Sequence, residues 1–320
     1  MCSRITFPAT DRRKEIQLNF VTSVEIQSSW KMMTDTADIV MPRKMKVFNG
    51  GSLTDYFQPG DTVRIELGYN GEYNKEFEGY IQNVGRGIPV TIHCEDEMYK
   101  LKRKTVSYSR KSVTLAQLIK DVAGGYDVVT SFGDTELGAV RYSAMTVSAI
   151  LDDVKKKTGL YSYFIGKTLY CGNVYSDKAQ LPEVNIFLER NAVSQDLQET
   201  GGDCEVIATA ILEGGKKLEA KAGTSGAETV NLNYNVKDET VTVEVLKKFA
   251  ERYYESLKKQ KYKGGVELFG IPMVTHGMTI NLRSEITPEM DGRYFIEKVT
   301  KTFSDSATYR QKVELGGRAE

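Results

Sequence analysis

Residues 60–67 read GDTVRIEL and residues 77–84 read FEGYIQNV, and from Val63 to Leu67 every second side chain is apolar. This alternation is the period of a strand with one buried face. Between the two runs stands Asn70-Gly71, a dipeptide typical of a tight hairpin turn. A third apolar run follows at 89–94, so we expect a three-stranded meander within a small barrel or sandwich.

The same arrangement returns near the end of the chain. Residues 277–282 read GMTINL and residues 291–299 read DGRYFIEKV, each run begins at a turn, and a further strand-like run follows. Two strands that recur in the same order and with similar content indicate an internal repeat. The sequence therefore predicts a duplicated β-module.

Length and composition agree with several mainly β modules. The chain has 320 residues, which is more than one average domain. Its 18 Tyr and 28 Gly, beside two His and one Trp, favour strands and tight turns. The 43 basic and 43 acidic side chains cancel, which argues against a protein whose main work is to bind a phosphate backbone.

The cysteines and the apolar runs indicate where the protein is made. The four cysteines form neither a CxxC pair nor a dense disulfide framework; they are Cys2, Cys94, Cys171 and Cys204. We interpret them as ordinary small apolar residues in a protein that is made in a reducing compartment. We find no signal peptide and no run of about 18 uncharged apolar residues, so we expect no stable membrane insertion.

Other strands and helices are predicted from their periods. Alternation over 16–20 and 24–27 predicts a half-buried antiparallel hairpin, and a strand over 36–41 stops at a proline. The period then changes to that of helices at 112–125 and 146–159, each with a hydroxyl residue before its apolar stripe and a glycine after it. A β-like run follows each helix, which predicts a small α/β module.

Strand patterns return in the second half, interrupted by one long helix. The helix is predicted over 243–260, and the strands are predicted over 185–190, 204–212, 217–222, 264–269, 277–282, 292–301 and 307–315. We therefore expect an α+β, mainly β chain with two similar antiparallel β-barrel modules and a small α/β insert between them. The predicted boundaries are 1–105 for the first barrel, 106–182 for the insert, and 183–320 for the second barrel with its helix.

The strand motifs also carry a family resemblance. In the first half they are GDTV at 60–63, FEGYI at 77–81, VTIHCED at 90–96 and YKLK at 99–102, and in the second half LFGIP at 268–272, Gly277 and DGRYFI at 291–296. In this order they resemble bacteriophage tail hub proteins of the late-control-D and baseplate-hub group, and they are similar to the hub part of type VI secretion spike proteins. The helix over 146–159 followed by Leu169-Tyr170 looks like the middle module of that family, whereas the Gly-rich segment 200–235 does not align.

The resemblance implies a non-enzymatic protein of the virion tail or baseplate, made in the bacterial cytoplasm. It implies a homotrimer whose two similar barrels form a pseudo-sixfold ring that joins a hexameric tail tube protein to a threefold central spike protein, with passage of DNA through a central channel. The symmetry argument also holds on its own, because three copies of a duplicated module present six similar surfaces.

Catalytic, cofactor-binding and metal sites are not predicted. The two histidines, His93 and His276, lie in a strand pattern and before a turn glycine, and His93 points away from its neighbour Cys94 if that run is a strand. The acidic runs 95–97 and 152–153 could supply a carboxylate to the catalytic pair of a hydrolase, but we interpret both runs as solvated turns. Glycines form neither GxGxxG nor a P-loop pattern.

Two surfaces allow more than one interpretation. The basic residues Lys100, Lys102, Arg103, Lys104, Arg110 and Lys111 are interleaved with Tyr99 and Tyr108. A solvated rim is favoured for this strip, while an acidic protein partner or DNA stays open. The helix over 243–260 carries an apolar stripe that favours core packing over a subunit contact.

Two other function classes stay open from the sequence. One is a hub-associated cell-wall hydrolase, which zymography on cell walls would detect, although no surplus segment carries such a motif. The other is a carbohydrate-binding adhesion module, for which Trp30 and the tyrosines are the candidate stacking groups.

Overall fold

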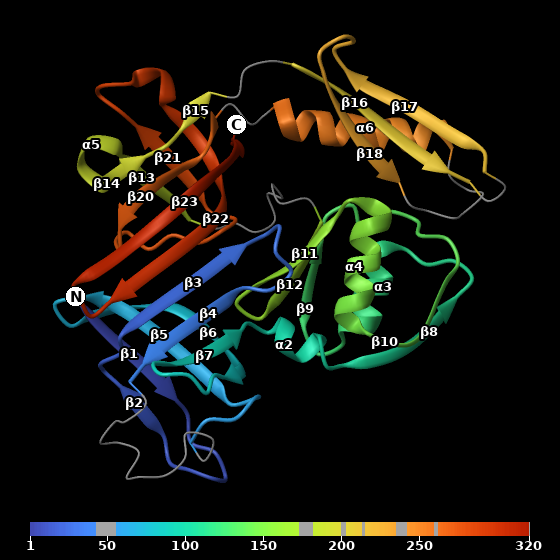
Figure 1. Ribbon diagram of the computed structural model, residues 1–320. Coiled ribbons are helices and arrows are strands. Elements are labelled where there is room, and N and C mark those ends of the chain that lie inside the picture. Colours follow the sequence, from blue (N-terminus) through green and yellow to red (C-terminus); the bar gives the residue numbers. More distant parts are fainter. Residues whose placement is uncertain are drawn as a thin grey trace.

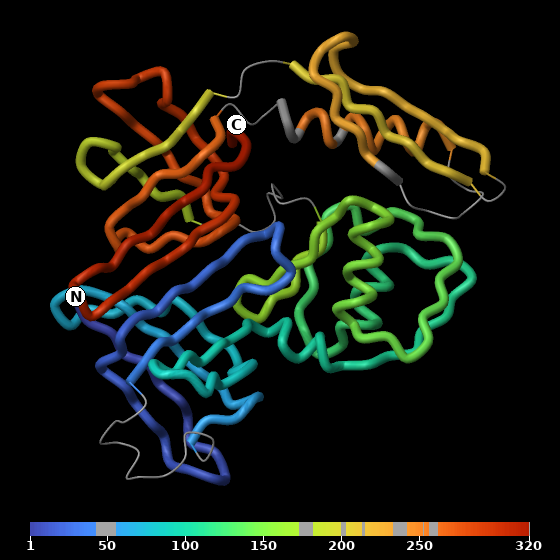
Figure 2. Tube along the Cα trace, viewed as in Figure 1, coloured from blue at the N-terminus to red at the C-terminus, as the bar shows by residue number. Residues whose placement is uncertain are grey.

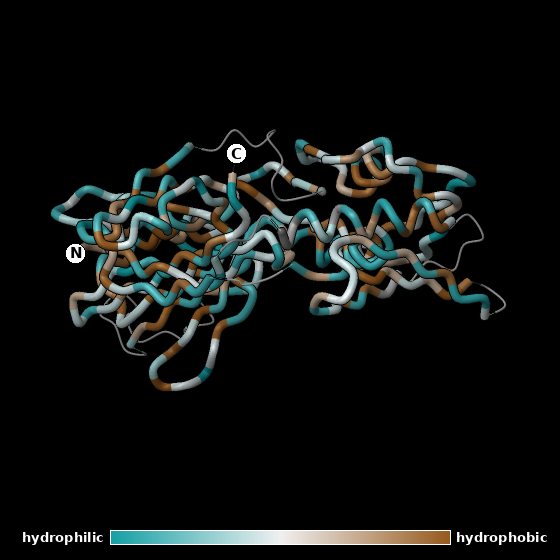
Figure 3. Tube along the Cα trace, turned by 90° about the horizontal axis from the view of Figure 1, so that it is seen from above, coloured by the Kyte–Doolittle hydropathy of each residue, from teal (hydrophilic) through white to brown (hydrophobic). Residues whose placement is uncertain are grey.

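The computed structural model describes residues 1–42, 56–172, 182–199, 203–212, 215–234, 242–258 and 262–319. The protein is mainly β with a minority of helix (Figure 1). Hydrophilic and hydrophobic residues alternate along many of its strands (Figure 3), as half-buried sheets require. The predicted α+β, mainly β class is confirmed.

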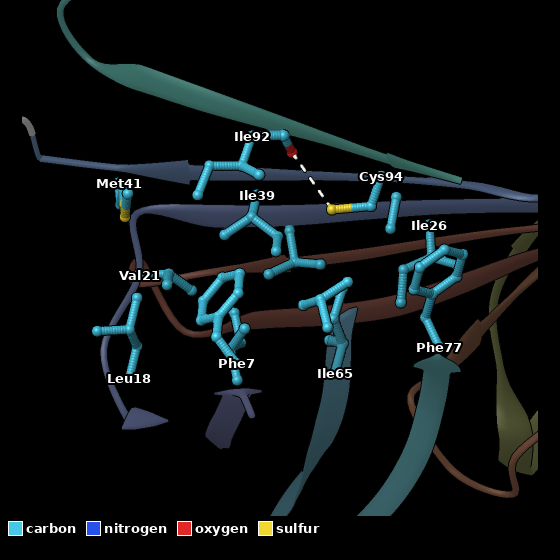
Figure 4. Packing of buried hydrophobic residues seen from close by; sticks show 14 of the residues in the cluster. Phe7, Leu18, Val21, Ile26, Ile39, Met41, Ile65, Phe77, Ile92 and Cys94 are labelled. Carbon is cyan, nitrogen blue, oxygen red and sulfur yellow. Dashed lines mark hydrogen bonds between the residues drawn. The ribbon is translucent and has the colours of Figure 1, made fainter. Parts of the chain in front are cut away.

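The first half of the main sheet contains the predicted meander. Its strands are β1 (Cys2–Phe7), β2 (Ile16–Leu18), β3 (Ser23–Ser29), β4 (Thr36–Met41), β5 (Thr62–Tyr69), β6 (Glu72–Val84) and β7 (Val90–Glu95). β5, β6 and β7 pair antiparallel in succession. The turn between β5 and β6 uses Asn70 and Gly71, both with positive φ (52° and 88°). The inward side chains form one core around Phe7, Ile39 and Ile65 (Figure 4).

The hairpin expected from residues 16–27 is wrong. β2 pairs with β1, and β3 pairs with β4 on one side and with a strand of the C-terminal region on the other. Phe20, expected on the buried face, is 58% exposed because it lies outside both strands. Alternation located strand segments here, but it did not identify their partners.

The middle of the chain forms an α/β layer with its own core. Its elements are α2 (Met98–Leu101), β8 (Thr105–Arg110), α3 (Leu115–Ala123), β9 (Asp127–Thr130), β10 (Val140–Thr146), α4 (Val147–Thr158), β11 (Tyr161–Ile165) and β12 (Thr168–Gly172). Both predicted helices are confirmed with their caps. The hydroxyls of Thr114 and Thr146 accept from the N–H groups of Gln117 and Ala149, and Gly159 ends α4 in the left-handed region.

The second half completes the main sheet. Its elements are β13 (Glu183–Phe187), α5 (Leu188–Asn191), β14 (Ala192–Gln195), β15 (Gln198–Glu199), β19 (Tyr262–Lys263), β20 (Gly265–Phe269), β21 (Thr279–Arg283), the 3₁₀ turn η3 (Pro288–Met290), β22 (Gly292–Ser304) and β23 (Thr308–Arg318). The strand expected over 185–190 ends early. β13 loses its partner β21 after Phe187, and the chain turns into α5, where the Asn191 side chain accepts from the Phe187 N–H (2.9 Å).

Residues 203–258 include a separate small layer. It consists of β16 (Cys204–Ile211), β17 (Lys217–Gly223), β18 (Glu228–Tyr234) and α6 (Val243–Lys258), with strand order β17-β16-β18 (Figure 1). Leu246 and Ala250 of α6 share a core with Val206 and Ala208 of β16. The helix predicted over 243–260 thus exists up to Lys258, the last two predicted residues lie outside the described part of the chain, and its stripe packs on this sheet.

The two expected barrels are not seen as closed barrels. The described strands of both halves form one 13-stranded sheet whose main path is β14-β20-β23-β22-β3-β4-β7-β6-β5-β1-β2, with β13 and β21 as a branch. The sheet stays open because β22 pairs with β3 of the other half. It bends around two cores, one from residues 5–94 with Phe303 and Tyr309, and one from residues 186–315.

Candidate assembly surface

The first and last parts of the chain are joined edge to edge. Residues 298–304 of β22 pair antiparallel with residues 23–29 of β3, and the two segments run side by side in Figures 1 and 2. Phe303 of β22 and Tyr309 of β23 contribute to the core of the first half. The C-terminal hairpin therefore belongs to both halves of the sheet.

A buried ion pair stabilises this join. The Lys301 ammonium of β22 contacts the Glu76 carboxylate of β6, and their side chains are 4% and 0% exposed. The Tyr309 hydroxyl donates to Glu76 Oε1 (2.8 Å), and the Tyr69 hydroxyl donates to the Tyr309 carbonyl (3.2 Å). Burial, and then the nearby Glu76 charge, raise the pKa of Tyr309. Both halves of the sheet thus share one polar cluster in a dry environment.

The α/β layer meets the sheet at a second polar cluster. His276 is 2% exposed, its Nε2 lies 3.2 Å from Asp35 Oδ2, and its ring meets Tyr163 of β11 edge to face. Asp35 also accepts from the Ser29 N–H (3.1 Å) and donates its own N–H to Asp96 Oδ2 (3.2 Å). The cluster therefore links the β3–β4 turn, the end of β7, the second half and the α/β layer.

We expect Asp96 to make stability depend on pH. Burial, and then the neighbouring Asp35 charge, raise the pKa of Asp96 well above its ordinary value. Between the unfolded and folded pKa values the folded state binds more protons, so the free energy of unfolding falls as pH rises through this window and levels off above the folded pKa. Denaturant unfolding from pH 4 to 9 should show a shallower fall for Asp96→Asn than for the wild type. Equal slopes would contradict the assignment.

The outer face of the joined sheet carries a polar row across five strands. Cross-strand neighbours on β23, β22, β3, β4 and β7 are Arg310, Thr302, Glu25, Asp38 and His93, and on β20 the row ends at Phe269. His93 Nδ1 lies 2.7 Å from Asp38 Oδ1, with both side chains nearly half exposed. The face mixes both charge signs with hydroxyls, which suits contact with water or a polar partner.

The predicted duplication extends to individual hydrogen bonds. In each half, a turn glycine and the residue after it exchange main-chain bonds with one isoleucine of the long strand. The residues are Gly60, Asp61 and Ile81 in the first half, at 2.8 Å, and Gly277, Met278 and Ile296 in the second, at 2.9–3.0 Å. One residue beyond each isoleucine the pairing with the next strand slips, at Gln82 in β6 and at Glu297 in β22. Both halves thus carry a β-bulge at the same place.

The residues considered for catalysis have structural partners. Cys94 points into the core, with its thiol toward the Ile92 carbonyl (Figure 4), and burial raises the pKa of this thiol. The solvated turns predicted at 95–97 and 152–153 are wrong. Asp96 and Glu97 are buried, and Glu97 accepts from the hydroxyls of Tyr80 (2.9 Å) and Tyr126 (2.8 Å). Asp152 and Asp153 lie in α4, where they pair with Lys156 and Lys157.

Two of the six cations of the basic strip pair with carboxylates of the chain. Lys102 pairs with Glu95 (2.9 Å) and Lys100 with Glu97 (3.2 Å). Arg103 lies over the Tyr99 ring, 3.5 Å from its centroid, Arg110 lies 5.2 Å from the Tyr108 ring centroid, and the Lys104 ammonium donates to the Ala123 carbonyl (2.9 Å). Lys111 is exposed. The two ion pairs reduce the charge that the strip can offer to DNA.

Trp30 is not a sugar-stacking platform in this chain. It is 6% exposed and meets Tyr161 edge to face, with ring centroids 4.9 Å apart. Within the described ranges there is no group of three His, Cys, Asp or Glu side chains placed to hold a metal ion. None of the described helices is long and apolar enough to cross a membrane.

Comparisons with known proteins identify the fold. A tail protein from Neisseria meningitidis MC58 is similar over 98% of this chain and 96% of its own, with a TM-score of 0.69 at 15% identity. The 43 kDa tail protein of prophage MuSo2 from Shewanella oneidensis covers 98% of both chains, with a TM-score of 0.67 at 16% identity.

A secretion protein is also similar. A type VI secretion component from Escherichia coli, described as similar to the T4 bacteriophage tail proteins gp27 and gp5, has a TM-score of 0.60 at 9% identity and covers 94% of this chain and 74% of its own. No protein-family model and no curated protein matches the sequence. The chain therefore has the fold of phage tail and type VI secretion proteins, which confirms the resemblance as a likeness of fold.

Proposed function

We propose that this chain, which has the fold of phage tail proteins, is a structural tail or baseplate hub protein. In this proposal it trimerises into a pseudo-sixfold ring and joins a hexameric tail tube protein to a threefold central spike protein. The observation that carries the proposal is the duplication, with the same turn, hydrogen bonds and bulge in two halves of one sheet. Three copies would present six similar units to a sixfold partner and still obey threefold symmetry.

The partition of the chain follows from this function. We propose residues 1–105 and 183–320 as the two hub modules and residues 106–182 as an insert. The separate core of residues 186–315 supports the second division, whereas at the first division Met98 and Leu101 of α2 already pack in the core of the insert. The layer of β16, β17, β18 and α6 has its own core within the second module.

We further propose that the polar face of the joined sheet lines a central channel through which DNA passes. Its polar row holds the Arg310 guanidinium, the Thr302 hydroxyl and the neighbouring carboxylates of Glu25 and Asp38, so both charge signs are present. Such a wall would bind a phosphate backbone weakly, which suits passage. The protein would then be a non-enzymatic part of the virion tail.

The solution mass tests the proposal. Light scattering coupled to size exclusion should give about 108 kDa, three times the 35.9 kDa mass of one chain. A trimer that binds its tail tube protein would support the hub. A chain that remains monomeric at the highest accessible concentration would contradict it.

A further inference from the structure

A polar pocket of about 560 Å³ lies where the first half of the sheet meets the α/β layer. Its lining comes from α2 and the residues just after it, from the segment that joins α3 to β9, and from the turn between β11 and β12. In Figure 1, α2 connects β7 of the sheet with the α/β layer. A volume of this size is typical of small-molecule sites.

Three ammonium groups from separate segments line the pocket. They belong to Lys100 in α2, Lys104 just after it, and Lys167 in the β11–β12 turn. Lys104 donates to two main-chain carbonyls at the end of α3 (2.9 and 3.2 Å), which leaves it one N–H donor. Lys167 is exposed and, within the part of the chain that the structure describes, forms no hydrogen bond and no ion pair. The pocket therefore contains a cation that is available to a ligand.

Two carboxylates also line the pocket, and one of them is already satisfied. Glu97 is buried, its Oε1 accepts from the Tyr80 hydroxyl (2.9 Å), and its Oε2 accepts from the Tyr126 hydroxyl (2.8 Å) and pairs with Lys100 (3.2 Å). Asp127, at the start of β9, is exposed and has no such partner among the described residues. The lining thus carries one more positive charge than negative charges.

The main chain adds donors to the same lining. The N–H groups of Gly125 and Tyr126, which follow α3, form no hydrogen bond within the described ranges of the chain. Gly125 has a φ of 95°, and an added Cβ would have no neighbour within 4 Å, so the space beside it is open. Unpaired N–H groups beside cations form the concave sites that anions occupy in proteins.

We propose that this pocket binds an oxyanion, which is the phosphate or carboxylate group of a small ligand. Lys167 supplies the free cation, Lys104 supplies its remaining donor, and the main chain after α3 supplies neutral donors. Phosphate should bind more tightly than carboxylate, because it carries more charge and more acceptor oxygens. All of these groups belong to one chain, so the site does not depend on the proposed trimer.

Calorimetric titration of the full chain tests the site. The probes are inorganic phosphate, pyrophosphate and succinate, each at the same ionic strength because surface charge is screened by salt. We expect both phosphates to bind, and to bind more tightly than succinate. Tighter binding of succinate would still support the pocket and would assign it to carboxylate ligands. If no probe binds at millimolar concentration, the inference is overturned.

Three substitutions separate this pocket from general surface charge. Lys167→Gln should weaken pyrophosphate binding about fivefold, because it removes a charged donor from an exposed site. Asp127→Asn should tighten binding about threefold, because it removes a repelling charge at nearly constant size. Lys111→Gln is the matched control, since Lys111 is also exposed and without a bonded partner among the described residues but lies outside the pocket. Equal effects of Lys167→Gln and Lys111→Gln, or weaker binding by Asp127→Asn, would contradict the assignment.

A measurement on the wild type needs no variant. Pyrophosphate should slow hydrogen exchange at the main-chain amides of Gly125 and Tyr126, because bound oxygens would accept from them. The amide of Gly71, in the distant β5–β6 turn, is the internal control and should not change. Binding that leaves Gly125 and Tyr126 unprotected would place the anion elsewhere and overturn the inference. The solution mass tests the proposed hub separately, so failure of either proposal leaves the other standing.

Discussion

Lys301→Ala is expected to lower the free energy of unfolding by about 3–5 kcal/mol, because it leaves the buried Glu76 carboxylate without its counter-charge. Glu76 would keep the Tyr309 hydroxyl as a donor, but a neutral hydrogen bond does not replace a cation in a dry site. Denaturant unfolding, with the slope compared between wild type and variant, measures the loss.

The control for this prediction is a surface ion pair on β6, the strand of Glu76. Lys75 pairs with Glu78 at 2.9 Å, with side chains 59% and 41% exposed. Lys75→Ala should therefore change stability by less than about 1 kcal/mol. The double variant Lys301→Met with Glu76→Leu should recover most of the loss, because it removes both charges from the core. If Lys301→Ala and Lys75→Ala had equal effects, the cluster would not stabilise the join.

Gly270→Ala is expected to destabilise the protein by about 1–3 kcal/mol through overpacking at the same cluster. An added Cβ would lie within 2.5 Å of three ring atoms of Tyr309, whose side chain is completely buried. The ring would have to move away from Glu76, and the Gly270 N–H, which donates to the Tyr69 hydroxyl (3.1 Å), would move as well. Thermal unfolding followed by circular dichroism measures the effect.

A nearby exposed position is the control for Gly270. Met273 is 38% exposed, so Met273→Ala should stay within about 0.5 kcal/mol of the wild type. Tyr309→Leu added to Gly270→Ala should leave less additional loss than Tyr309→Leu alone in the wild type, because the smaller side chain makes room for the Cβ. Additive losses would mean that Gly270 does not act through Tyr309.

Much of the local structure was predictable. Asn70-Gly71 has the positive φ values that its hairpin turn requires, and Thr114 and Thr146 cap their helices as their positions before the apolar stripes predict. The recurring run after Gly277 predicted a second meander. This meander is present, and it carries a bulge at the same place as the first one. These features depend on neighbouring residues, so a single sequence carries them.

The joins between distant segments were missed. Lys301 stands among Val299, Thr300, Thr302 and Phe303, and its inward place in this alternation was the signal that it would be buried. No comparable pattern predicted that its partner Glu76 is buried. Near a turn between strands, whether a side chain points inward or outward depends on the neighbouring strand. Asp35, Asp96 and His276 likewise meet only when three regions of the chain pack together.

Many of the strands, the turns, the capped helices, the mainly β class and the repeated strand pattern could be predicted, because each follows from side chains a few residues apart. Contacts between distant segments were needed to establish that β3 pairs with β22 rather than with β2, that the sheet is open instead of forming two closed barrels, and that α6 packs on a separate sheet. The physical reason is that a strand edge presents the same N–H and C=O groups whatever its sequence. Alternation fixes which face of a strand is buried, whereas packing over the whole chain selects the neighbour at its edge.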